Sequence, residues 1–244
     1  MRSTLLAAAF LIAVGGLLAQ APDPKAPQPD PKAPAPQPPV DPKAPAPQPP
    51  VDPKVQPPVP APAATASDFF PIKKGTKWTY KYAESDVVME VKESAAEVKV
   101  DTLSNGKVVA SETLKLMADA QGGGGIYRTK INNLDITPPL KILDMETKAG
   151  KLVPKAKGTK WAVDVKVQQA TLKGDYTIGE TVKLKLPAPL GDTDAVPVVA
   201  ELNIGGTATT VKYWFATGKG QVKVSYTIAN NEQAMELKTF EEGK

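Results

Sequence analysis

The chain has 244 residues, 26 of them proline, and it contains neither cysteine nor histidine. These absences exclude disulfides, cysteine nucleophiles, Ser-His-Asp triads, histidine-ligated zinc and a lipid anchor on an N-terminal cysteine, and we expect no metal and no cofactor. The net charge is +4, and lysines and acidic residues are interspersed along the chain. A nucleic-acid-binding protein would instead gather its basic residues on one face, so nucleic acid is not an expected partner.

Residues 1–21 predict a secretory signal peptide. Arg2 is followed by an apolar run over residues 5–18 and then by Ala19-Gln20-Ala21, the order of regions found in such peptides. The run would span about 21 Å as a helix, short of the roughly 30 Å of a bilayer core, so an uncleaved membrane anchor is the less favoured alternative. Cleavage after Ala19 and cleavage after Ala21 both remain open. Once the peptide is removed, we expect no membrane-spanning segment.

Residues 22–67 predict a disordered, proline-rich linker. Nineteen of the 26 prolines lie in this stretch, and the eleven residues 33–43, APAPQPPVDPK, recur unchanged at 44–54. Each proline fixes φ and removes a backbone donor, which excludes helix and sheet and favours extended polyproline II. We expect a stiff tether. Docking of its PxxP motifs onto an aromatic groove is the alternative.

Residues 68–244 predict one all-β domain. Residues 78–82, WTYKY, alternate aromatic and polar side chains with the period of two that is typical of a half-buried strand. Asn105-Gly106, Gly205-Gly206 and Asn230-Asn231 separate similar runs and favour tight hairpin turns. We expect about a dozen strands without helical crossovers, hence an antiparallel curved sheet, barrel or sandwich.

An internal repeat divides this domain into two related halves, 68–150 and 151–244. Residues 71–78, PIKKGTKW, recur as PKAKGTKW at 154–161, and both copies lead into an alternating segment. Trp78 and Trp161 therefore hold equivalent positions. Large aromatic residues at strand starts usually pack into a core, and the alternative is a pair of platforms on which a ligand stacks.

Two phrases of the domain resemble an uncharacterised family of secreted bacterial β-rich proteins. Residues 70–82 resemble its FPLxxGxxWxY motif, and residues 213–223 resemble its YWFAxGxGxVK motif. The resemblance implies an extracytoplasmic β domain and supplies no catalytic residues. A looser similarity of architecture is to half-barrel envelope proteins that carry lipids or lipoproteins, and fold analogy does not establish function.

Few groups suited to catalysis remain. Glu84 and Asp86, or Asp192 and Asp194, are the closest acidic pairs, and both look like turn residues; a glycan hydrolase would need two facing carboxylates in a cleft. A calcium site at Asp192 and Asp194 is disfavoured because the rest of a binding loop is absent. Residues 121–125, QGGGG, predict a flexible connector, with a mobile lid as the alternative.

We therefore expect an exported, non-enzymatic domain of the cell envelope or periplasm that binds an apolar or amphipathic ligand. A structural or protein-interaction module is the alternative, with an envelope protein as partner, and a glycan hydrolase is less favoured. The candidate ligand-binding residues are the aromatic side chains at the motif positions, since barrel mouths and clefts use such groups: Phe70, Trp78, Tyr80, Trp161, Tyr213 and Trp214.

Overall fold

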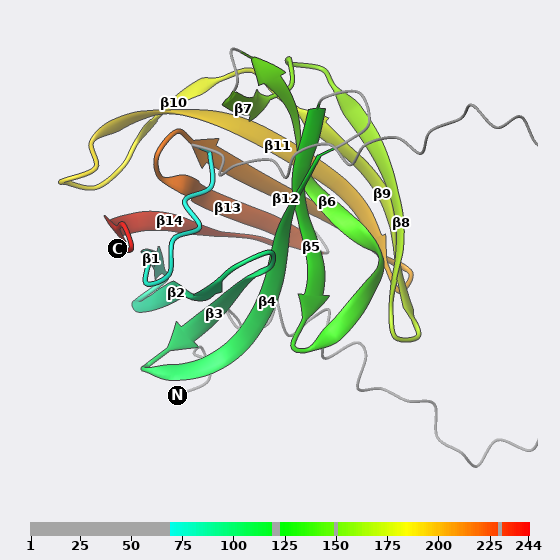
Figure 1. Cartoon of the computed structure of the whole chain (residues 1–244), viewed down its shortest axis with the longest axis horizontal. Helices are drawn as coiled ribbons and strands as arrows, with labels where there is room; N and C mark the ends of the chain where they lie inside the picture. The colour runs from blue at the N-terminus through cyan, green and yellow to red at the C-terminus, as the bar shows by residue number, and fades with distance from the viewer. Residues whose placement is uncertain (1–68, 119–122, 149–150, 229–230) are drawn as a thin grey trace, which may run out of the picture. The chain divides into compact units, whose positions relative to one another are not determined.

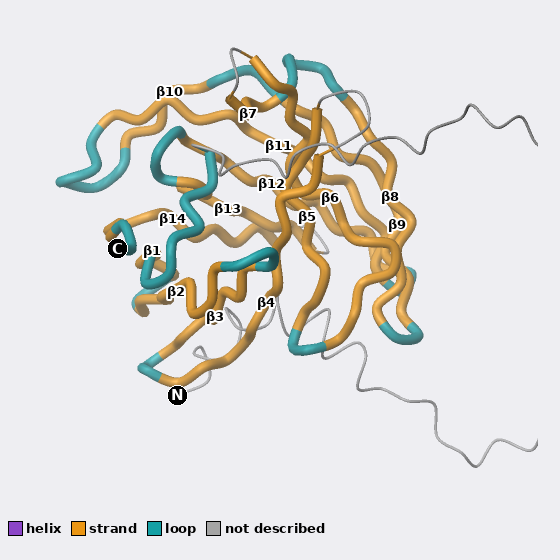
Figure 2. The backbone as a smooth tube through the Cα atoms, in the orientation of Figure 1, coloured by secondary structure: helices purple, strands orange, loops and turns teal. Residues whose placement is uncertain are grey.

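A computed structural model describes residues 69–118, 123–148, 151–228 and 231–244. The predicted signal peptide and proline-rich linker lie outside the described residues. Over the described residues the chain consists of strands and short loops (Figure 2). No helix in these parts of the chain is long and apolar enough to cross a membrane.

The sheet contains fourteen strands, and their order along the chain is shown in Figure 1. Their bounds are β1 (Lys77–Tyr82), β2 (Ser85–Ser94), β3 (Val98–Ser104), β4 (Lys107–Ala118), β5 (Gly123–Ile131), β6 (Leu134–Lys148), β7 (Lys151–Pro154), β8 (Lys160–Val167), β9 (Ala170–Ile178), β10 (Val182–Lys185), β11 (Asp192–Ile204), β12 (Thr207–Ala216), β13 (Gly220–Ile228) and β14 (Asn231–Glu241).

The sheet closes on itself as an antiparallel barrel. Neighbouring strands follow the order β11-β12-β13-β14-β1-β2-β3-β4-β5-β6-β8-β9, and β9 pairs with β11 to complete the ring. Two short strands lie off the ring, β7 on β6 and β10 on β11. The predicted all-β antiparallel fold is confirmed, and of the three expected forms the domain adopts the barrel.

Alternation within each strand sends apolar side chains inward. In β1 the aromatic residues Trp78, Tyr80 and Tyr82 are buried, while Thr79 and Lys81 on the other face are not. The same period of two runs through β8, where Val163, Val165 and Val167 are buried between exposed residues. Burial of alternate positions on every strand is what a barrel with one packed interior requires.

Two of the predicted hairpin turns have the backbone that their residues favour. Asn105 and Gly106 join β3 to β4 with φ of 51° and 71°, and Gly205 and Gly206 join β11 to β12 with φ of 56° and 93°. Positive φ at both central residues is characteristic of the tight turn that matches strand twist. Asn230 lies outside the described residues.

The glycine-rich stretch differs from the prediction of a connector or lid. Residues 121 and 122 are outside the described residues, but Gly123–Ile131 is strand β5, and Gly124 and Gly125 are buried. A Cβ on Gly124 would lie 2.4 Å from the Met117 carbonyl oxygen, and one on Gly125 would lie 2.6 Å from that of Leu143. The glycines are needed because the neighbouring strands approach too closely for a side chain.

The two copies of the repeated motif form the same turn. Gly75 and Gly158 both have φ of 84°, and their amides donate at 2.8 Å to the carbonyls of Val91 on β2 and Ile178 on β9, in each case the second strand after the turn. Each predicted half contributes six strands to the closed ring. The division of the domain into two related halves stays a prediction.

Candidate functional site

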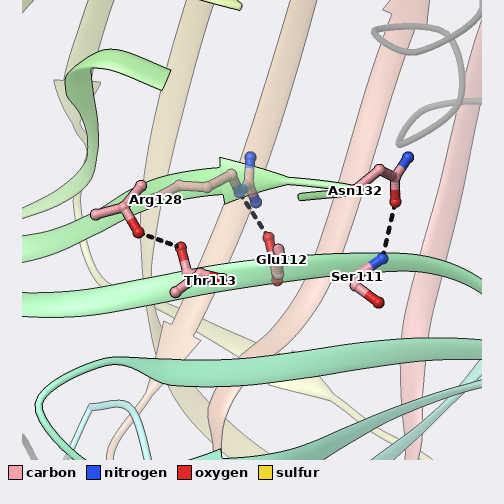
Figure 3. Close-up of polar contacts among 6 residues, drawn as sticks. Ser111, Glu112, Thr113, Arg128 and Asn132 are labelled. Atoms are coloured by element: carbon pink, nitrogen blue, oxygen red, sulfur yellow. Dashed lines mark hydrogen bonds and ion pairs between the residues drawn. The ribbon is translucent and has the colours of Figure 1, made fainter. Parts of the chain in front are cut away.

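A charged pair lies inside the barrel. The Arg128 Nε on β5 donates to the Glu112 Oε2 on the neighbouring strand β4 at 2.6 Å (Figure 3). The side chains are 13% and 4% exposed, so both charges are largely removed from water. Taking two charges out of water costs several kcal/mol per ion, about as much as their attraction returns, so such a pair is weak evidence for stability alone. A buried ion pair in an apolar interior therefore marks a candidate site.

Arg128 is also unusual in composition. It is the only arginine in the chain besides Arg2 in the predicted signal peptide, although the chain contains 30 lysines and arginines in total. A guanidinium carries five donors in a planar fork and is more weakly hydrated than an ammonium, which makes it the cation suited to a buried position.

Two tyrosines, on β9 and β12, complete a group of residues that we call the polar cluster: Glu112, Arg128, Tyr176 and Tyr213. Burial raises the pKa of Tyr176 well above its ordinary value, and the neighbouring Tyr213 adds to that rise. Burial also raises the pKa of Tyr213, although the positive charge of Arg128 acts against the rise. For Arg128, burial would lower the pKa, but Glu112 and the two tyrosines more than offset it, and the pKa is raised. The cluster thus holds one full ion pair and two protonated phenols at neutral pH.

The Tyr176 hydroxyl makes no hydrogen bond of good geometry, although Tyr213 lies close enough to influence its pKa. It and the Thr102 hydroxyl are the buried side-chain oxygens without a partner among the described residues. Tyr176 is 0% exposed, and its ring stacks on Trp161 at a centroid distance of 5.2 Å. An unpaired buried hydroxyl costs about 1–3 kcal/mol, so a group retained there despite the cost suggests an absent partner.

A small cavity of about 20 Å³ adjoins the polar cluster. Its polar lining consists of Arg128, Tyr176 and Tyr213, and the rest is apolar: Ile131, Ile136, Leu140, Val165, Val167, Leu172, Leu202 and Ile204. This volume suits a single water molecule, and anything larger requires the walls to separate. The residues that line the cavity include no carboxylate, so it lacks the facing acids of a glycan hydrolase.

The wall over the cavity contains the weakest junction of the ring. Strands β6 and β8 share two paired positions, Ile136 with Val167 and Thr137 with Lys166, whereas β8 and β9 share eight. Pro138 and Pro139 follow on β6 and carry no N–H, so the strand cannot continue to donate there. We call the stretch of β6 over residues 138–144, which passes β8 unpaired, the seam.

One side-chain contact crosses the seam where backbone pairing is missing, and ion pairs of Asp144 brace the β6 side of it. The Trp161 Nε1 on β8 donates to the Lys141 carbonyl at 3.1 Å. Asp144, with a side chain 5% exposed, accepts from Lys141 at 2.8 Å and pairs with Lys155 at 3.0 Å. The junction of β6 and β8 therefore has the shortest backbone ladder of the ring, and strands held by few backbone hydrogen bonds are the ones expected to open first.

The six predicted aromatic residues are divided between four places. Phe70 and Trp78 pack together at one end of the barrel, where the Trp78 Nε1 donates to the Lys219 carbonyl at 2.5 Å, and Tyr80 donates to the Gln221 carbonyl at 2.7 Å. Trp161 lies at the seam and Tyr213 in the polar cluster. Trp214 points outward on β12, with the Lys223 ammonium 5.4 Å from its ring centroid.

Glu112, Arg128 and Tyr176 are site residues that the sequence patterns did not indicate. The single arginine of the domain was the available signal for the site, because a residue type used once among many lysines suggests a position that lysine cannot fill.

The acidic pairs lie on the outer surface. Glu84 is exposed in the turn between β1 and β2, and Asp192 and Asp194 are exposed positions on β11, opposite Lys185 and Lys183 of β10. The last two are therefore strand residues, not turn residues as expected, because β10 adds to the edge of β11. No three acidic side chains within the described ranges lie close enough together to hold a metal ion.

Comparison with known proteins adds two crystal structures of low sequence identity. A candidate lipoprotein from Parabacteroides distasonis is 16% identical, with a TM-score of 0.48 over 71% of this chain and 98% of that one. A candidate exported protein with a YmcC-like fold from Bacteroides fragilis is 15% identical, with a TM-score of 0.42 over 72% of this chain and all of that one. No protein-family model matches the sequence, and no curated protein matches it.

Proposed function

We propose that the protein is an exported, non-enzymatic binding protein of the cell envelope, and that its barrel interior takes up an apolar or amphipathic ligand. Export is supported by the basic, apolar and small-residue order of residues 1–21, and the proline-rich residues 22–67 suit a tether that holds the domain away from its point of attachment.

The observation that carries the proposal is the unpartnered Tyr176 hydroxyl beside an apolar cavity. Ligand sites in β-barrels combine mostly apolar walls with a few polar groups that orient the ligand. The cavity has this composition, with Arg128, Tyr176 and Tyr213 as the polar groups. The closed form has little internal volume, so a ligand must first make room for itself. It does so by separating β6 from β8 along the seam.

Native mass spectrometry of the mature protein, purified gently from the envelope of the cells that make it, tests this function. We expect an adduct of several hundred daltons that disappears on denaturation. The matched control is Trp214→Ala, which alters an outward-facing aromatic residue and leaves the interior intact, so its adduct should persist. A bare mass for the wild-type protein in repeated preparations would contradict the proposal.

A second candidate function is a protein-interaction module. Strand β10 pairs with β11 alone in the described sheet, and its Val182 side chain is 38% exposed. An extended segment of a partner can add to such an edge through main-chain hydrogen bonds. Crosslinking in intact cells from position 185 would capture that partner, and Lys183→Pro in the same protein would abolish capture by blocking strand addition.

A further inference from the structure

We infer that the ligand of the barrel interior is an uncharged amphiphile, with a head group that accepts hydrogen bonds through an ester, amide or hydroxyl oxygen. This inference rests on the proposed function and narrows it from apolar or amphipathic ligands in general to one chemical class. It follows from the donors that the polar cluster offers, from its charge balance and from the remaining walls.

The polar cluster offers donors to a ligand. The Arg128 Nε is taken by Glu112, but a guanidinium carries four further N–H groups, and Arg128 lines the cavity. Tyr176 lines the same cavity, and its hydroxyl is fully buried and makes no hydrogen bond of good geometry. A ligand oxygen with lone pairs satisfies both groups at once, whereas a purely apolar ligand leaves the hydroxyl unpaired.

The charge of the polar cluster is already balanced. Arg128 is the single charged residue among the described residues that line the cavity, and Glu112 neutralises it at 2.6 Å. A carboxylate or phosphate bound there would bring a second negative charge close to Glu112 without a further cation, and like charges repel strongly where water is excluded. A cationic head group would be repelled by the Arg128 guanidinium for the same reason.

The remaining walls suit one hydrocarbon chain. Apart from the polar groups, the cavity is lined by isoleucine, leucine and valine side chains from β5, β6, β8, β9 and β11. The closed cavity is about 20 Å³, so each added methylene requires further separation of β6 and β8. A single chain demands less opening than two, which favours a monoacyl compound over a diacyl lipid.

Three probes with matched ten-carbon chains test the inference on the mature protein at pH 8: monodecanoylglycerol, decanoate and decyltrimethylammonium. Titration calorimetry below the micelle concentration of each probe measures the affinities. We expect monodecanoylglycerol to bind at least tenfold more tightly than either ion. Tyr176→Phe should weaken its binding about tenfold, the equivalent of one hydrogen bond, without lowering the melting temperature. The control Tyr127→Phe, which changes a tyrosine that does not line the cavity, should leave binding unchanged.

The outcomes separate the inference from the proposed function. Equal or tighter binding of decanoate, or of the cation, would overturn the inference and leave a ligand-binding barrel in place. Unchanged binding of monodecanoylglycerol by Tyr176→Phe would also overturn it. Failure of all three probes to bind, together with a bare mass for the protein from envelopes, would overturn both.

Discussion

Arg128 and Glu112 lie on neighbouring strands and meet at 2.6 Å within the interior of the barrel, with side chains that are 13% and 4% exposed. The contact joins the single arginine of the domain to one of the few acidic side chains that face inward. The pair is a costly way to fill a core position, and its presence beside an unpartnered hydroxyl is the reason to place function in the interior.

Removing one partner of this pair should lower the free energy of unfolding by more than removing both partners together. Glu112→Gln leaves an uncompensated guanidinium and should lower the free energy of unfolding by about 3–5 kcal/mol, whereas the double variant Glu112→Leu/Arg128→Met should recover most of the loss. Urea unfolding followed by tryptophan fluorescence measures both. The control Lys238→Gln, at an exposed pair with Asp86, should change stability by about 1 kcal/mol or less. Additive losses in the double variant would contradict the prediction.

Two tyrosine-to-phenylalanine variants should change stability in opposite directions. Tyr176→Phe removes a buried hydroxyl without a partner and should raise the free energy of unfolding by about 1 kcal/mol. Tyr80→Phe removes a hydroxyl that donates to the Gln221 carbonyl at 2.7 Å, which leaves that carbonyl unsatisfied and should lower stability by about 1–2 kcal/mol. Thermal and urea unfolding of the two proteins check the signs, and a loss on Tyr176→Phe would show that the hydroxyl has a partner.

Alkaline pH should unfold the barrel through its tyrosines. Burial raises the pKa of Tyr80, Tyr176 and Tyr213 in the folded protein, while in the unfolded chain tyrosine ionises near about pH 10. A folded pKa above the unfolded one gives stability that is complete below about pH 10 and is lost as pH rises further. Phenolate absorbance near these pH values should therefore rise in step with loss of near-ultraviolet circular dichroism. Separate tyrosine titration in a barrel that stays folded would contradict this.

A disulfide across the seam should block ligand uptake. The chain has no cysteine of its own, and Thr137 and Lys166 are exposed partners in the last backbone pairing before the seam. In the oxidised Thr137→Cys/Lys166→Cys protein, we expect monodecanoylglycerol uptake to slow at least tenfold, with recovery on reduction. The control pair Glu201→Cys/Thr210→Cys joins β11 to β12 away from the seam and should have no effect. Equal rates in the oxidised and reduced forms would place the entrance elsewhere.

The two tryptophans Trp78 and Trp214 should respond differently to truncation. Trp78→Ala empties a site that is 1% exposed and removes contacts with Phe70 and Phe240, so it should lower the free energy of unfolding by about 3–5 kcal/mol. Trp214→Ala removes an outward, half-buried ring, and its loss in the free energy of unfolding should be less than half of the loss for Trp78→Ala. Calorimetric unfolding of both variants measures the difference.

Local structure was predictable from the sequence because a strand repeats every two residues. The alternation in residues 78–82 places Trp78, Tyr80 and Tyr82 on one face wherever the strand lies, and Asn105-Gly106 favours a tight turn through its own backbone preferences. The absence of cysteine and histidine excluded whole classes of chemistry with no reference to the fold.

Contacts between distant strands required the tertiary structure. The polar cluster joins β4 and β5 to β9 and β12, and these strands face one another only because β9 pairs with β11 and closes the ring. Residues 127–130, YRTK, are all polar or amphipathic, so their pattern does not show which side chains of this strand face inward. Bulges in β5 also shift the register on either side of Arg128. The sequence by itself determined which residues share a face of one strand, while closure of the barrel decided which faces meet, since that pairing depends on contacts between residues far apart in the chain.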